Sequence, residues 1–272
     1  MCIRDRIPFG GIQISPDTDS RFYDAASGYK YNHLTLMGFS LTHLSGTGIP
    51  DLGDFLFIPG TGEMKLEPGT HEDPDQGYRS RYSHDKEWAS PNYYAVELAD
   101  YGVKAEMTSG VRSGMFRFTY PESDNAFIMI DMNHTLWQSC EWSNLRMIND
   151  STITGYKLVK GWGPERHVYF TATFSKKLTG LRFVQDKKPV IYNTSRFRSS
   201  YEAWGKNLMA CISFDTKAGE EVTVKTAISA VSTDGARNNM KELDGLTFNE
   251  LRAKGEALWA VSYTHLRAHE TS

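Results

Sequence analysis

The sequence has few cysteines and no long apolar run. Three cysteines occur among 272 residues, Cys2, Cys140 and Cys211, and no two have the C-x-x-C spacing of a metal site. We expect Cys140 and Cys211 to be buried free thiols, while one disulfide between them stays open as an alternative. No stretch approaches 18 consecutive apolar residues, so we expect no membrane-spanning helix.

An excess of positive charge and the common catalytic patterns are also missing. The formal net charge is -3, with lysine and arginine spread among acidic residues. Because a nucleic-acid partner requires a concentrated basic face, we expect none. There is no G-x-S-x-G motif and no recognisable Ser/His/Asp or Cys/His arrangement. The sequence therefore gives no sign of a nucleophilic hydrolase.

Alternation of apolar and polar residues with a period of two is the dominant pattern. In HVYFTATFS, residues 167–175, the apolar side chains fall on one face of an expected strand. Residues 93–109 indicate two strands around a turn at Asp100–Gly102. The other alternating segments are 115–121, 126–132 and 222–229. Many half-buried strands with short connections predict an all-β fold, a large antiparallel β-sandwich.

One C-terminal segment has helical spacing instead. In LTFNELRAKGEALWA, residues 246–260, the face that we expect to be buried carries Phe248, Leu251, Gly255 and Leu258. Thr247 followed by Glu250 forms a capping box, in which each side chain satisfies a backbone amide of the first turn. We therefore expect the sandwich to end near Ser232 and a helix to begin near Thr247.

Both ends of the chain look foreign to the rest. MCIRDR at the start and VSYTHLRAHETS at the end resemble translated sequencing adapters. We therefore expect an artefactual tail at 1–6, a β-sandwich domain at 7–240, a linker helix at 241–260 and a second artefactual tail at 261–272.

The stretch GFSLTHLSGTGIPDLGDFLFIP, residues 38–59, places many polar groups between two strand-like ends. His43 is a candidate ligand contact, or else a structural histidine with satisfied hydrogen bonds. Asp51 and Asp54, three residues apart, suit Ca²⁺ binding or acid–base chemistry, although such aspartates more often cap turns. The same alternatives, turn or ligand, hold for Asp17.

A long polar segment follows at 59–94, rich in glycine and proline. Segments of this length are usually functional or disordered. Its part RYSHDKEWASPNYY combines acidic residues with Trp88, a pairing common in sugar sites, since carboxylates accept hydroxyl hydrogen bonds while the indole stacks on the ring. Glu87 and Asp85 are candidate general acids. The alternative is a solvated loop with Trp88 packed on the sheet.

Taken together, several stretches resemble the N-terminal domain of glycoside hydrolase family 92, the bacterial calcium-dependent exo-α-mannosidases. The matching stretches include PFGGIQISPDT, SGYKY, GFSLTHLSGTGIPDLGDFLFIP, SHDKEWASPNYYAVELADYGVKAEMT, VYFTATFS and KAGEEVTVKTAISAVSTDGARNN. They follow the family order over roughly residues 7–259. One departure is Leu41, where many members have a histidine.

The resemblance implies a large sandwich of the galactose-mutarotase-like or supersandwich type, followed by a linker helix and an (α/α)₆ barrel that this chain lacks. In the family, that barrel carries the general acid, the general bases and most Ca²⁺ ligands of an inverting mechanism. The resemblance also implies a periplasmic, cell-surface or secreted protein. We therefore expect no catalytic residue here, and a fragment that is inactive alone.

The resemblance further implies that the polar loop forms one wall of a pocket for a mannose-containing glycan, with the barrel as the other wall. The residues predicted to line this wall are Asp17, His43, Ser45, Gly46, Asp51 and Trp88. Trp88 and His43 are the expected sugar contacts. Two alternatives remain: a stand-alone carbohydrate-binding sandwich with Trp88 and Tyr93/Tyr94 as its platform, and a structural sandwich without ligand.

Overall fold

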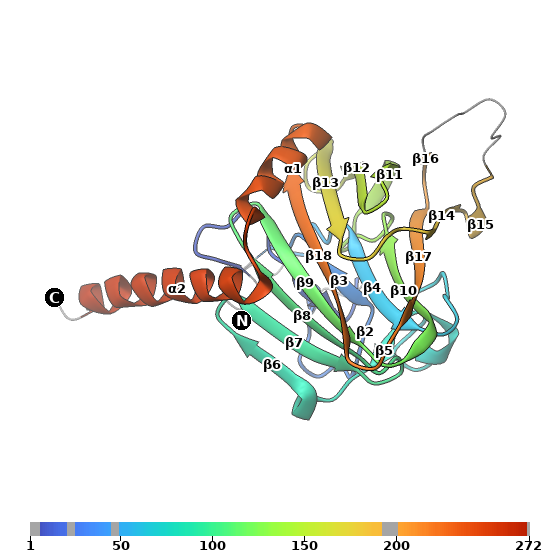
Figure 1. Ribbon diagram of the computed structural model, residues 1–272. Coiled ribbons are helices and arrows are strands. Elements are labelled where there is room, and N and C mark those ends of the chain that lie inside the picture. Colours follow the sequence, from blue (N-terminus) through green and yellow to red (C-terminus); the bar gives the residue numbers. More distant parts are fainter. Residues whose placement is uncertain (1–5, 21–24, 45–48, 192–200, 271–272) are drawn as a thin grey trace.

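A computed structural model describes residues 6–20, 25–44, 49–191 and 201–270. Two large antiparallel sheets pack face to face, and one long helix leaves the sandwich near the C-terminus (Figure 1). This arrangement confirms the predicted all-β sandwich followed by a helix.

The strands form one sheet of seven and one sheet of nine. The seven-stranded sheet has the order β1 (Ser15–Asp17), β3 (Gly38–Ser40), β4 (Leu56–Thr61), β10 (Ser123–Asp131), β17 (Leu208–Thr216), β14 (Gly180–Gln185) and β15 (Lys188–Pro189). The nine-stranded sheet has the order β16 (Glu202–Gly205), β11 (Ser139–Asn149), β12 (Thr152–Lys160), β13 (Arg166–Phe174), β18 (Glu220–Ser229), β9 (Ser113–Tyr120), β8 (Val103–Ser109), β7 (Tyr93–Leu98) and β6 (Glu87–Ser90). A small separate pair joins β2 (Thr35–Leu36) to β5 (Ser80–Arg81).

The core lies between the two large sheets. Strand β13 turns its alternating apolar residues inward as the sequence predicts, from Val168 to Phe174. Phe57 on β4 meets Phe116 on β9 with ring centroids 4.9 Å apart, which joins the two sheets. Burying such aromatic pairs supplies much of the stability of a sandwich.

Two smaller predictions are also confirmed. The β7–β8 hairpin turns at 99–102, where Gly102 has φ +62°, a conformation that glycine adopts without steric cost. Cys140 and Cys211 are buried free thiols.

The polar segment 59–94 is ordered and packs on the sandwich. It contains two short 3₁₀ helices, η2 (Pro74–Gln76) and η3 (His84–Lys86), together with β5 and β6. Tyr78 from this segment packs in a cluster with Met37 and Ile58 on the outer face of the seven-stranded sheet. The segment therefore covers a second, smaller core.

Two α-helices follow the last strand. Helix α1 (Thr233–Met240) was not predicted, and a 3₁₀ turn, η4 (Lys241–Leu243), continues it. Helix α2 (Phe248–Glu270) begins as predicted: the Thr247 amide donates to Glu250, and the Glu250 amide donates to the Thr247 hydroxyl.

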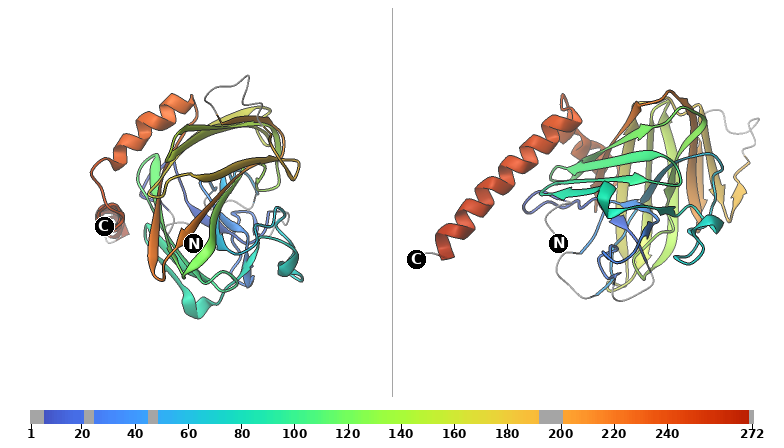
Figure 2. Two further views of the ribbon diagram at one scale, coloured as in Figure 1. Left: turned by 45° about the vertical axis from the view of Figure 1, so that its right-hand side comes forward. Right: turned by 90° about the horizontal axis from the view of Figure 1, so that it is seen from below.

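Helix α2 packs against the sandwich through its first turns, and Trp259 further along donates to the carbonyl of Arg6 at 2.7 Å. Phe248 and Leu251 pack against Tyr93 and Met115, whereas Leu258 is about half exposed. The helix then stands away from the sandwich (Figure 2) and extends past the predicted limit of 260 to Glu270. In the described part of the chain, no helix has the length and apolarity that crossing a bilayer requires.

Candidate functional site

The loop between β3 and β4 is fastened along both of its limbs. The Leu41 amide donates to the Asp54 carbonyl at 2.9 Å, and the Gly53 amide donates to the Thr42 carbonyl at 2.8 Å. His43 and Leu52 form an isolated antiparallel bridge. Ser45 and Gly46, two of the predicted contacts, lie outside the described residues. The described limbs of the loop 41–54 therefore form a paired base.

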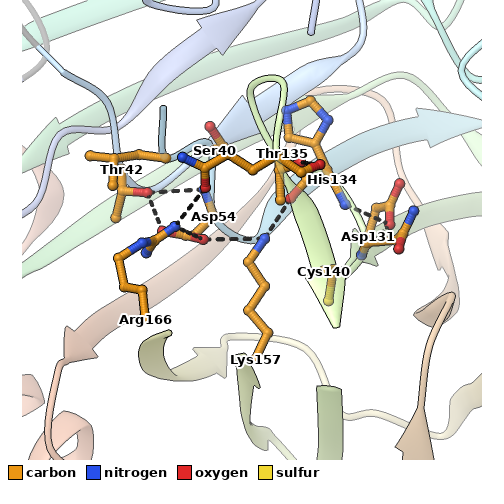
Figure 3. A network of polar contacts seen from close by, with 12 residues as sticks. Ser40, Thr42, Asp54, Asp131, His134, Thr135, Cys140, Lys157 and Arg166 are labelled. Carbon is orange, nitrogen blue, oxygen red and sulfur yellow. Dashed lines mark hydrogen bonds and ion pairs between the residues drawn. The ribbon is translucent and has the colours of Figure 1, made fainter. Parts of the chain in front are cut away.

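Asp54 anchors one side of this base through two cations (Figure 3). Its carboxylate accepts two hydrogen bonds from the guanidinium of Arg166, at 2.6 and 3.1 Å, and lies 3.2 Å from the ammonium of Lys157. The Thr42 hydroxyl donates a further hydrogen bond at 2.7 Å. Asp54 and Lys157 are both fully buried. The aspartate is therefore part of a charge centre beneath the loop.

The surroundings of Asp54 keep it ionised. Burial by itself would raise its pKa, but the positive charges of Lys157 and Arg166, with hydrogen bonds from Arg166 and Thr42, outweigh burial and lower the pKa to about 2. An aspartate in this state accepts hydrogen bonds and cannot donate a proton near neutral pH.

Asp17, on β1, forms a second buried centre with two histidines. Its Oδ1 accepts from Nε2 of His43 at 2.8 Å, and its Oδ2 accepts from Nε2 of His134 at 2.9 Å. Burial by itself would raise the pKa of Asp17, but the two histidines outweigh burial and hold this pKa well below its usual range. The loop is thus joined to β1 and to the segment that follows β10.

Both ring nitrogens of His43 have hydrogen-bond partners within the site. Its Nδ1 lies 2.9 Å from the carbonyl oxygen of Gln13, and its Nε2 faces Asp17. Both ring nitrogens of His43 are therefore engaged within the site, with the Ser40 hydroxyl also 3.0 Å from Nε2, so neither nitrogen is placed to act as a general base. Its role as a sugar contact stays a prediction.

His134 connects the two centres. Its side chain reaches Asp17, while its backbone carbonyl accepts from the Lys157 ammonium at 2.5 Å. Its amide lies 3.3 Å from Oδ1 of Asp131, the last residue of β10. One residue thus contacts both charge centres that hold the loop.

Asp51 is held at the side of the loop. Its carboxylate accepts from the side-chain amide of Gln138 and from the amide of Leu52. Gln138 in turn accepts from Arg166 at 3.4 Å, which connects Asp51 to the Asp54 centre. Asp51 is 8% exposed, so its carboxylate is positioned and nearly buried.

Gly28 packs directly against the carboxylate of Asp17, so a substitution at Gly28 tests how much the Asp17 centre contributes to stability. Gly28 has φ +84°, and a Cβ there would lie 2.0 Å from the carboxylate of Asp17. We expect Gly28→Ala to lower the free energy of unfolding by more than the roughly 1–2 kcal/mol of the left-handed backbone alone, because Asp17 must also move. Urea denaturation measures this loss.

Gly62→Ala is the matched control. Gly62 has φ +85°, but no atom lies within 4 Å of a Cβ at this position. Gly62→Ala should therefore lose only the stability that a left-handed backbone costs an alanine, without a steric clash. The additional loss of unfolding free energy in Gly28→Ala then measures the cost of displacing Asp17. Equal losses would show that the Asp17 centre tolerates the displacement.

Trp88 lies on β6 directly after Glu87, and the two side chains point to opposite faces of the strand. The indole is 65% exposed. The carboxylate of Glu87 accepts from the hydroxyls of Tyr94 at 2.6 Å and Tyr29 at 2.8 Å, and from His84 at 2.5 Å. Tyr29 adjoins Gly28, so the structure connects the Trp88 strand with the Asp17 centre.

Of the platform expected for a stand-alone sugar-binding module, Trp88 is exposed but the two tyrosines are buried. Tyr93 and Tyr94 are 5% and 0% exposed. Their hydroxyls donate to Glu106 and Glu87 respectively. The two rings belong to the packed interior, because β7 has strands on both sides and core on both faces.

The described residues do not fit a calcium ion. Across the ranges that the structure describes, no group of three or more His, Cys, Asp or Glu side chains could hold a metal. The carboxylates of Asp17 and Asp54 are already occupied by cationic partners. We therefore derive no calcium chemistry from this chain.

Four residues of the site were missed from the sequence: His134, Gln138, Lys157 and Arg166. Lys157 carried a usable signal. In TITGYKLVK, residues 152–160, it alternates in phase with Ile153 and Val159, which are buried. A lysine at an inward position of a strand requires a buried partner. No comparable pattern marks His134, Gln138 or Arg166.

Comparison with known families identifies the family of the chain. The profile of the glycosyl hydrolase family 92 N-terminal domain matches residues 3–229. The chain belongs to glycosyl hydrolase family 92. No match was found among curated protein sequences.

Solved structures of family 92 enzymes share the fold of this family 92 domain. The α-mannosidase BT3965 from Bacteroides thetaiotaomicron, solved with mannoimidazole, is 98% identical over 94% of this chain, with a TM-score of 0.92. The inverting mannosidase BT2199 from the same species is 22% identical over 94% of this chain, with a TM-score of 0.75, and shows the fold alone. The chain spans 34% and 32% of these two proteins.

Proposed function

We propose that this chain is the non-catalytic N-terminal domain of a calcium-dependent, inverting exo-α-mannosidase, and that its loop 41–54 forms one wall of the mannose pocket. The observation that carries the proposal is the pair of buried charge centres, Asp17 and Asp54, beneath this one loop. Placing two ionised carboxylates and their cations in a protein interior is costly. Such an arrangement is reasonable where a loop must present hydroxyl-binding groups in fixed positions.

The protonation states support a positioning role. Asp17 and Asp54 are ionised and paired, and both ring nitrogens of His43 are engaged by protein groups. An inverting glycosidase needs one carboxylic acid that protonates the leaving oxygen and one carboxylate that activates water. In the proposal, both of these groups and the Ca²⁺ ligands belong to the (α/α)₆ barrel that completes the enzyme.

The sugar contacts in the proposal come from the loop and from β6. Asp51 and His43 contribute to the glycan-binding wall, and Asp17 holds His43 in place. Ser45 and Gly46 stay predicted contacts of the same wall. Trp88 stacks on the apolar face of a pyranose ring, for which its exposed indole is suited. A periplasmic, cell-surface or secreted location is part of the same proposal.

Turnover of an α-mannoside tests the proposal in two settings. The purified 272-residue chain should show no hydrolysis with calcium or with chelator, because the acid and base lie elsewhere. In a full-length α-mannosidase that carries this domain, Trp88→Ala should lower kcat/KM by about tenfold, as expected for the loss of one aromatic contact. Steady-state assays measure both.

Trp204→Ala in the same enzyme is the control, since Trp204 is 52% exposed on β16 and belongs to no part of the proposed wall. Its kcat/KM should match the parent enzyme. Calcium-dependent turnover by the isolated chain would disprove the non-catalytic role, and unchanged kinetics of the Trp88 variant would remove that residue from the wall.

A further inference from the structure

An open groove of about 960 Å³ lies beside the candidate site. Met37, Tyr78 and Met209 contribute apolar surface to its lining, and Trp137, Gln138 and Asn207 are among its other lining residues. These six residues define the Trp137 groove. None of them was selected from the sequence, and the proposed wall does not use the groove.

Trp137 is presented to solvent in an unusual conformation. Its side chain is 65% exposed, and its backbone has φ +66°. Bulky residues rarely adopt positive φ, and such strain persists where the surrounding structure enforces it. Packing among the described residues leaves most of the ring exposed, so the strained backbone makes the indole a candidate platform for a ligand.

The segment around Trp137 is held on both sides. The Leu136 amide donates to the Leu52 carbonyl at 2.9 Å, and the Thr135 hydroxyl donates to the Gln138 carbonyl at 2.8 Å. His134 is fixed to Asp17. The indole is thus carried by the same frame that holds the loop 41–54, so little order needs to be gained when a ligand binds.

The charges around the groove point to a neutral ligand. Lys187 pairs with Glu67 at 2.5 Å, and Lys206 pairs with Glu141 at 3.0 Å. Asp186 accepts from the side-chain amide of Asn207 at 2.7 Å. Because each lysine at the groove has its own carboxylate, an acidic ligand gains little there. The carboxamides and the indole instead suit hydroxyl groups and the apolar face of a sugar ring.

The groove adjoins the proposed pocket wall. His134 lines the groove and binds Asp17, while Gln138 lines it and binds Asp51. We propose that the Trp137 groove binds a neutral hexose unit further along the glycan, by stacking on Trp137, while the terminal mannose meets the loop 41–54. The identity of the sugar rests on the proposed function; the groove and its platform do not.

Calorimetric titration of the 272-residue chain with α-linked mannotriose tests this inference. We expect binding that Trp137→Ala weakens by about tenfold or more, while Trp137→Phe keeps most of it because a ring remains. Trp204→Ala, at an exposed tryptophan that does not line the groove, should bind as the parent chain does. An acidic oligosaccharide of equal length should bind no better than mannotriose.

Trp137→Gly separates binding from folding. Glycine adopts the φ of this position without strain, so the variant should melt no lower than the parent while losing the binding. Absence of mannotriose binding by the parent chain, or binding unchanged in the Trp137→Ala and Trp137→Gly variants, would overturn the inference.

Failure of this inference is distinguishable from failure of the proposed function. Loss of mannotriose binding in Trp88→Ala but not in Trp137→Ala would contradict sugar binding in the Trp137 groove and would agree with the proposed pocket wall. The turnover assays of Trp88→Ala in the full-length enzyme test the proposed pocket wall independently of Trp137.

Discussion

Asp54→Asn is expected to lower the free energy of unfolding by about 3–5 kcal/mol, the usual cost of breaking a buried ion pair from one side. The carboxylate is the partner of Lys157, which is fully buried, at 3.2 Å. Asparagine preserves the shape of the side chain but removes the negative charge, so the ammonium is left in the interior without its counter-ion. Urea denaturation at neutral pH measures the loss.

The double variant Asp54→Asn/Lys157→Met distinguishes charge from shape. Methionine fills most of the lysine volume and needs no counter-ion, so we expect it to restore most of the lost stability. The remaining partner, Arg166, is partly exposed and can be solvated. A double variant as unstable as Asp54→Asn would show that the hydrogen bonds of Asp54, rather than the charge on Lys157, dominate the effect.

Acid is expected to destabilise the domain strongly between about pH 4 and pH 2. The pKa of Asp54 is lowered from 3.8 to about 2 in the fold, so as pH falls the unfolded chain takes up the proton first. The stability from this ionised group is complete above the unfolded pKa and is lost as pH falls through the folded one. Asp54 alone accounts for about 2 kcal/mol, and Asp17 adds to the loss in the same direction.

Urea midpoints measured from pH 6 to pH 2 check this dependence. The double variant at positions 54 and 157 should show a shallower decline, because one of the two responsible carboxylates is absent. A parent chain whose midpoint stays constant down to pH 2 would contradict the lowered pKa of Asp54 and of Asp17.

The strands were predictable because their signal is local. Alternation in residues 167–175 reflects a strand with one face toward the core, and the structure places β13 there. Helix α1 gave no such signal, since TDGARNNM is poor in strong helix formers. Its helical conformation depends on the Ser232 cap, which accepts from the Gly235 amide, and on burial of Ala236 against the sheet.

The candidate site was predictable only at the loop itself. Polar density in residues 38–59 indicated the loop, but its partners come from distant strands. Arg166 is 112 residues from Asp54, and His134 is 117 residues from Asp17. Such pairs depend on strand order in the two sheets, which one sequence does not specify. The exposure of Trp137 accompanies a positive φ at that one residue, which the sequence likewise does not predict.

The two buried charge centres around Asp17 and Asp54 limit which substitutions this domain can accept during evolution. A single substitution at Asp54 or Lys157 leaves the other residue's charge buried without a counter-ion. These two positions are therefore expected to change together, through intermediates that fold poorly. Trp137 stands outside that constraint, because its ring is largely in solvent. We therefore expect descendants of this domain to explore new ligands through residue 137 and its exposed neighbours while the charged frame stays the same.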